Sequence, residues 1–170
     1  MRIIKTQNMG GISVLVDDED FERLNQYNWF IVAKGYVVRN AKKDNGKWTR
    51  VYMHKDILEV PEGYEVEHAD QNKANNQKSN LRPATRSENM ANVRRAQKAG
   101  AHSKYKGVSK LNRPNLKRKW LSYIKVDYKM YYNGYYETEE EAAHVYNQFA
   151  EQIFGEFAYL NVIDWAYEYW

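Results

Sequence analysis

The most informative stretch of the chain is YEVEHADQNKANNQKSNLRPATRSEN, residues 64–89. Its first five residues alternate between apolar and polar side chains, which predicts a strand that ends at His68. An Asn-rich polar loop follows, and then Asn80-Leu81-Arg82. Thr85 and Glu88 have the spacing of a capping box, which predicts a helix from about residue 85 to about residue 99.

The side chains of this stretch suit the hydrolysis of a phosphodiester. A hard cation such as Mg²⁺ needs few protein oxygens, because it keeps several waters and takes other ligands from phosphate. Glu67 and Asn89 can provide two such oxygens. A neutral imidazole, with an ordinary pKa of about 6.5, can activate a water, which makes His68 a candidate general base. Asn80 can accept the second ring N–H and so fix the tautomer.

The ordered set of Glu67-His68, Asn80-Leu81-Arg82 and Asn89 resembles the HNH (ββα-metal) endonuclease motif of phage and intron-encoded enzymes. The resemblance implies a nuclease module in which Glu67 and Asn89 hold Mg²⁺, Mn²⁺ or another divalent cation. It also implies that His68 is the general base and that Asn80 is the middle Asn of the motif. Many members have Asp where this chain has Glu67, which is the main departure.

Residues 51–58 resemble the segment that precedes this motif in homing-type nucleases. His54 lies within them, and two interpretations of it stay open. It contacts a phosphate of the substrate, or it is a structural histidine that is hydrogen-bonded inside the module.

Composition excludes several classes of protein. The chain of 170 residues has 43% hydrophobic and 15% aromatic residues, too many for a disordered protein. It has no Cys, which excludes disulfides and cysteine-built zinc sites, so we expect no structural zinc. No apolar run approaches the roughly 20 residues of a membrane span. We therefore expect a protein of the cytoplasm, in a bacterial or phage-infected cell, with no membrane partner.

The charges are unevenly distributed along the chain. Residues 1–92 are nearly neutral, with 14 Lys and Arg against 13 Asp and Glu. Residues 93–130 carry 12 Lys and Arg and one acid, whereas residues 131–170 carry eight acids and no Lys or Arg. A basic segment with interleaved aromatic residues is typical of a surface that binds a polyanion. Arg94 and Arg95 begin this segment and are candidate DNA contacts.

The second half of the chain has a different pattern. Strands are expected near residues 105–110, 119–126 and 129–136, followed by a helix that Thr138 and Glu141 cap. Residues 103–161 resemble the plant ethylene-response-factor (Apetala-type) DNA-binding domain, in which a three-stranded antiparallel sheet packs on one helix. This resemblance implies that the exposed sheet face enters the major groove of DNA. It places six residues on that face: Lys106, Ser109, Tyr123, Lys125, Met130 and Tyr132.

Together these patterns predict an α+β protein of two modules, a nuclease over residues 1–100 and a DNA-binding module over residues 101–170. The expected activity is divalent-metal-dependent, homing-type cleavage of double-stranded DNA. Two alternatives stay open: a DNA-binding regulator with a weakened nuclease site, and a structure-selective phage nuclease. The sequence does not fix the oligomeric state, although we favour a monomer.

Overall fold

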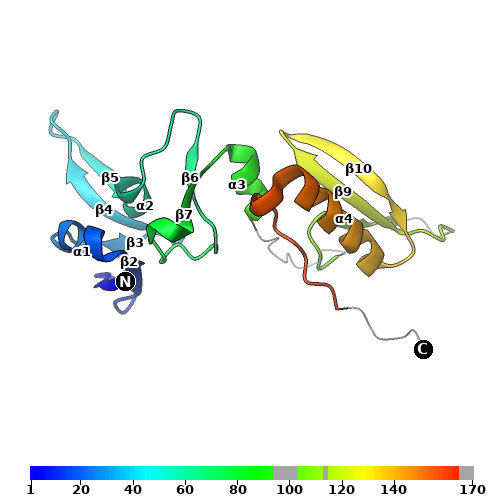
Figure 1. Cartoon of the computed structure of the whole chain (residues 1–170), viewed down its shortest axis with the longest axis horizontal. Coiled ribbons are helices and arrows are strands. Elements are labelled where there is room, and N and C mark those ends of the chain that lie inside the picture. Colours follow the sequence, from blue (N-terminus) through cyan, green and yellow to red (C-terminus); the bar gives the residue numbers. More distant parts are fainter. Residues whose placement is uncertain (94–102, 113–114, 165–170) are drawn as a thin grey trace. The chain divides into compact units, whose positions relative to one another are not determined.

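The computed structural model describes residues 1–93, 103–112 and 115–164 (Figure 1). The chain divides into two compact units, Met1–Arg86 and Ser87–Trp170. The candidate DNA contacts Arg94 and Arg95 lie outside the described residues. None of the helices in the described ranges is long and apolar enough to cross a membrane.

The first unit is built from small antiparallel sheets around short helices. Strands β1 and β2 form one hairpin, β3, β4 and β5 form a three-stranded sheet, and β6 pairs with β7. The elements in order are β1 (Arg2–Lys5), β2 (Ser13–Val16), α1 (Asp18–Asn25), β3 (Phe30–Ile31), β4 (Val37–Lys42), β5 (Trp48–Tyr52), α2 (Met53–Ile57), β6 (Glu65–His68), the 3-10 turn η1 (Lys78–Asn80) and β7 (Leu81–Ala84).

The core of the first unit lies between the β1–β2 hairpin, α1 and one face of β4. Trp29 is fully buried at its centre, and its indole N–H donates to the Leu24 carbonyl at 2.8 Å. Val14, Val37 and Met53 pack around them. The β6–β7 hairpin is attached to this unit through its loop, which hydrogen-bonds to the Leu15 backbone of β2, so it is not an isolated two-stranded ribbon, which would be marginal in water.

The second unit is a three-stranded sheet covered on one face by a helix, as the sequence predicts. The strands lie in the order β10-β9-β8, and α4 packs against all three (Figure 1). Thr138 and Glu141 form the expected capping box at the start of α4, and Gly155, with φ of 50°, follows its end. The elements are α3 (Arg86–Asn92), β8 (Val108–Lys110), β9 (Trp120–Val126), β10 (Lys129–Tyr136), α4 (Glu139–Phe154) and the 3-10 turn η2 (Gly155–Phe157).

The short helix α3 packs with the second unit. Ala91 belongs to the core cluster of Ile124 and Tyr146, and its carbonyl accepts a hydrogen bond from Tyr159 at 3.2 Å. The compact units thus divide between Arg86 and Ser87, whereas the sequence places the change of module after residue 100. α3 extends as far as Asn92, and residues 94–99 of the expected helix are not described.

Candidate functional site

The β6–β7 hairpin presents Glu67 and His68 on opposite faces. In its register Glu67 lies across from Arg82, and His68 lies across from Leu81. Both side chains are buried, with exposed fractions of 4% and 6%. A buried carboxylate and a buried imidazole are costly unless their polar atoms have partners, so the contacts of each are informative.

One oxygen of the Glu67 carboxylate is paired and the other is not. Arg82 Nε donates to Glu67 Oε2 at 2.7 Å. Glu67 Oε1 is buried and accepts no hydrogen bond from the residues that the structure describes. Buried carboxylate oxygens are rarely left without a donor or a cation. Oε1 is therefore suited to ligate a divalent cation, while Arg82 fixes the orientation of the carboxylate.

The amide that faces the His68 ring belongs to Asn76. Asn76 Oδ1 lies 3.3 Å from His68 Nε2, and Asn76 Nδ2 donates to the Lys73 carbonyl at 3.1 Å. Because Nδ2 must face a carbonyl oxygen, Oδ1 is the atom turned to the imidazole. An oxygen at this position favours the neutral tautomer that carries its proton on His68 Nε2, in which the basic lone pair is on Nδ1.

The surroundings of His68 keep its ring neutral. Its centroid lies 5.2 Å from that of His54 and 6.3 Å from that of Tyr36. Burial lowers the pKa of His68 below its ordinary value, and the Asn76 contact opposes part of that shift. A neutral imidazole at physiological pH has the protonation state that a general base needs.

Asn80 acts on the loop and not on the imidazole, so the expected contact between Asn80 and the His68 ring is wrong. Asn80 Oδ1 accepts from the Asp70 N–H at 3.0 Å, and its Nδ2 donates to the Asn75 carbonyl at 2.8 Å. These bonds span the loop from the end of β6 to the start of β7. Asn80 thus fixes the loop that carries Asn76, which positions His68 indirectly.

The loop is also braced from outside the motif. The Leu15 N–H donates to the Ala74 carbonyl, and the Asn76 N–H donates to the Leu15 carbonyl, both at 2.8 Å. Asp17 accepts from the Lys78 N–H at 2.7 Å. Asn76 and the bracing residues Leu15 and Asp17 were not identified from the sequence, because only the fold brings β2 against residues 74–78.

His54 is buried beside His68. Its ring centroid lies 5.2 Å from that of Tyr36 and 5.5 Å from that of Tyr52. Burial lowers the pKa of His54 to about 3, so the ring carries no charge at neutral pH. This favours the structural interpretation of His54, since a neutral buried ring offers a phosphate no positive charge.

Asn89 lies on α3, in the second unit, and its role as a metal ligand stays a prediction from the family resemblance. The described residues contain no group of three or more His, Cys, Asp or Glu side chains that could hold a metal ion.

Five of the six residues predicted to face DNA share one face of the second sheet. Tyr132 lies across from Tyr123, Met130 from Lys125, and Leu121 from Ser109. The opposite face carries Ser122 and Ile124, both buried under α4. The alternation predicted for β9 is confirmed at Ser122 and Ile124, whereas Leu121, on the face of Tyr123 and Lys125, is itself buried. Lys125, Met130 and Tyr132 of that face are exposed.

Lys106 is the exception, and its assignment as a DNA contact is not supported. Its Nζ donates to the carbonyls of Met90 at 3.2 Å and Val93 at 2.9 Å, and also to that of Ala91. These carbonyls are at the C-terminal end of α3, where a cation is favourable. Burial lowers the pKa of Lys106 to about 8. The side chain caps a helix instead of facing solvent.

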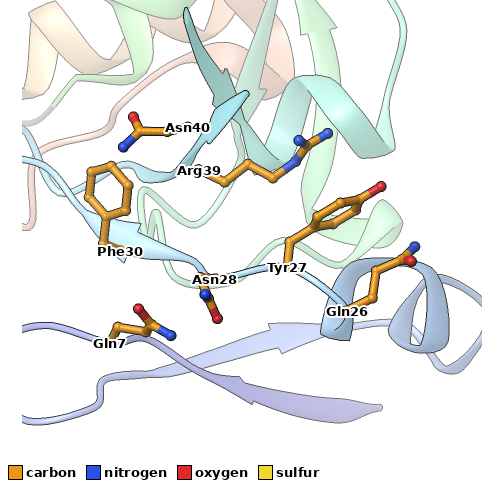
Figure 2. Close-up of a pocket in the computed structure, with 7 residues that line it drawn as sticks. All are labelled: Gln7, Gln26, Tyr27, Asn28, Phe30, Arg39 and Asn40. Atoms are coloured by element: carbon orange, nitrogen blue, oxygen red, sulfur yellow. The ribbon is translucent and has the colours of Figure 1, made fainter. Parts of the chain in front are cut away.

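A pocket of about 410 Å³ lies beside β4 in the first unit (Figure 2). None of the predicted catalytic residues lines it. Arg39 lies 4.0 Å over the Tyr27 ring and pairs with Asp56 at 3.4 Å, so its charge is used within the fold. The lining consists of Gln7, Gln26, Tyr27, Asn28, Phe30, Arg39 and Asn40.

Comparison with known proteins identifies relatives of this chain. Residues 59–91 match the family model of HNH endonucleases. A protein of Acanthamoeba polyphaga mimivirus, named as an uncharacterized HNH endonuclease, is 34% identical over 163 residues. That alignment covers 91% of this chain and 77% of the relative, so it includes most of both units. No solved structure matches the chain.

Proposed function

This chain belongs to the HNH endonuclease family and is a nuclease, and on that premise we propose that it cleaves double-stranded DNA in a homing-type reaction that needs a divalent cation. The observation that carries the proposal is the presence of Glu67 and His68, both buried, at successive positions of β6. Glu67 Oε1 is buried and has no hydrogen-bond partner among the described residues, and burial favours the neutral form of His68. An intact site of this kind argues against a regulator whose nuclease site has decayed.

In the proposed reaction His68 Nδ1 accepts a proton from a water molecule. The resulting hydroxide attacks phosphorus, and the bond from phosphorus to the 3′-oxygen breaks. Asn76 keeps the proton on Nε2, so that Nδ1 is the basic atom throughout the approach of the water. Glu67 Oε1 and Asn89 are the proposed ligands of Mg²⁺ or Mn²⁺. When bound, the cation would offset charge that develops on the phosphate and on the leaving oxygen.

DNA binding is assigned to the exposed face of the second sheet. Lys125 is exposed on it, its Nζ 5.5 Å from the ring centroid of Tyr128, and Tyr132 is 64% exposed. A cation beside exposed aromatic rings suits contact with a phosphate backbone and base edges. This arrangement supports the proposed likeness to the ethylene-response-factor domain. We expect Lys125→Gln to weaken duplex binding at every sequence and to lower its salt dependence.

The test of the nuclease proposal is nicking of supercoiled plasmid in Mg²⁺, Mn²⁺ or EDTA. We expect cleavage with either cation and none with EDTA. His68→Ala should lower the rate by about 10²–10⁴-fold, the usual contribution of a general base, and leave DNA affinity within a few-fold. His144→Ala, at an exposed histidine of α4, is the matched control. A His68→Ala variant that cuts at the wild-type rate would reject the assignment.

Glu67 has its own pair of variants. Glu67→Gln keeps the size of the side chain but removes its charge, so we expect cleavage only at a much higher concentration of cation. Glu67→Asp should keep activity, since Asp is common at this position of the family motif. Loss of activity in Glu67→Asp would show that the site requires the longer side chain.

A further inference from the structure

We propose that the outer part of the β4–β5 hairpin is a second DNA-contacting surface, on which Lys42 and Arg50 bind phosphates and Trp48 packs against sugars and base edges. The surface, called here the hairpin face, consists of Asn40, Lys42, Trp48 and Arg50. This inference rests on the proposed nuclease function and extends it from the reacting phosphate to the DNA beside it.

The strand register places these four side chains together. Asn40 lies directly across from Arg50, and Lys42 lies directly across from Trp48. Alternate residues of a strand share a face, so all four lie on one side of the β4–β5 ribbon. All four are exposed. Trp48 is 72% exposed, which is unusual for so large an aromatic side chain.

The opposite side of the ribbon is used differently. Arg39 belongs to that side, and it pairs with Asp56 and stacks on Tyr27. Figure 2 shows Arg39 directed toward Tyr27, whereas Asn40 leaves the strand in the other direction. The described residues provide no ion pair to Lys42 or Arg50. Strand alternation therefore separates a cation that supports the fold from two that are available to a ligand.

The hairpin face continues into the candidate catalytic site. Tyr52 has the same parity as Arg50 and Trp48, and it lies across from buried Val38. The ring centroid of Tyr52 is 5.5 Å from that of His54, which is in turn 5.2 Å from that of His68. One side of the β4–β5 ribbon thus extends from Tyr52, near the proposed general base His68, to Trp48.

The dimensions of the ribbon suit a duplex that extends from the cleavage point. From Tyr52 to Trp48 is four residues, or about 13 Å at the usual rise of a strand. Base pairs rise by about 3.4 Å, so this length corresponds to roughly four base pairs. DNA whose scissile phosphate lies at His68 can therefore pass Arg50 and then Lys42 and Trp48.

The charge of the hairpin favours a polyanion as the partner. Residues 37–52 contain five Lys and Arg and one acid, Asp44. Arg39 pairs with Asp56, so the other four cations face a single acid within the hairpin. An exposed indole among unpaired cations is a combination typical of nucleic-acid surfaces, where cations neutralise phosphates and aromatic rings contact sugars or bases. An acidic protein could also pair with these cations. If the surface served only such a partner, however, the affinity of the protein for DNA would not depend on Trp48.

The experiment measures binding of the full-length protein to a short random-sequence duplex by fluorescence anisotropy, between about 50 and 200 mM salt. Lys42→Gln and Arg50→Gln should each lower the slope of log affinity against log salt by about one, and the double variant by about two. Trp48→Ala should weaken binding by about five-fold or more with an unchanged slope, and Trp48→Phe should recover most of the loss. Lys5→Gln removes an exposed charge from β1, on a different sheet, and serves as the matched control.

Plasmid nicking by the same proteins separates this inference from the nuclease proposal. If the double variant binds and nicks as the wild type does, the hairpin face is not a DNA surface and the nuclease proposal stands. If the wild type binds the duplex but never nicks plasmid, the nuclease proposal fails, while the slopes still decide the role of the hairpin. A wild-type protein that does not bind duplex DNA would overturn both.

Discussion

Asn76 offers the most direct test of how the site prepares its base. Its side chain is 1% exposed, with Nδ2 on the Lys73 carbonyl and Oδ1 3.3 Å from His68 Nε2. Asn76→Ala removes both contacts and leaves the imidazole without the acceptor that fixes its tautomer. We expect the rate of cleavage to fall by about 10–100-fold, the usual effect of losing such a supporting group. The free energy of unfolding should fall by about 1–3 kcal/mol, because buried polar groups lose their partner.

Asn76→Asp separates positioning of the base from a purely structural role. It keeps the acceptor but adds a negative charge, which favours protonated His68 and raises its pKa. The base must be neutral to work, so the acid limb of the rate profile should move to higher pH. Asn76→Ala removes a contact that favours the protonated ring, so in that variant the same limb should move to lower pH.

The assay is single-turnover nicking between about pH 5 and pH 8, the range in which histidine commonly titrates. Duplex affinity and thermal unfolding are measured beside it. Opposite displacements of the acid limb in the two variants would support the assigned tautomer. A uniform loss of rate that follows only the folded fraction, or a wild-type rate in Asn76→Ala, would refute it.

Three further predictions concern the supports of the two units. Burial lowers the pKa of His54 to about 3, so below about pH 6.5 the unfolded chain binds a proton that the folded chain does not. The free energy of unfolding, measured by urea denaturation, should therefore fall by roughly 1 kcal/mol per pH unit toward pH 4. His54→Gln should make this fall shallower. Lys106→Gln should speed amide exchange in α3 without changing the salt slope of duplex binding, because the Lys106 ammonium group donates to carbonyls of that helix. A reduced slope in this variant would show that Lys106 contacts DNA. Gly107→Ala should lower the thermal stability by about 3 kcal/mol or more, since the added Cβ would lie 1.9 Å from the Tyr146 ring at a backbone φ of +72°, and an unchanged melting temperature would contradict this packing.

Strand alternation and motif spacing were enough to predict much of the architecture. Ser122 and Ile124 are buried under α4 because β9 has an apolar face, and that face can be identified in the sequence. Glu67 and His68 occupy neighbouring positions of one strand, as the alternation before the Asn-rich loop predicts. Patterns of this kind are local, so no knowledge of distant contacts is needed.

Local sequence patterns could not show which asparagine of the loop contacts the His68 ring. Asn76 and Asn80 are both amides near His68 in sequence, and both are buried. Asn76 reaches the ring because the Leu15 backbone holds the loop in one register, a contact across some sixty residues. Lys106 was misassigned for a similar reason. A lysine in a basic segment is expected to be exposed, and only the fold places the end of α3 at its ammonium group.

Net charge is a poor guide to where the first unit can meet DNA, because it counts paired and unpaired cations alike. Several basic residues of the first unit are paired within the fold: Arg23 with Asp20 and Asp56, and Arg82 with buried Glu67. These pairs contribute to the near-neutral sum but produce little field outside the protein. The cations of the hairpin face have no such partners among the described residues. A nearly neutral unit can therefore present a locally positive surface next to its proposed catalytic site, and the salt slopes of the hairpin variants measure that surface directly.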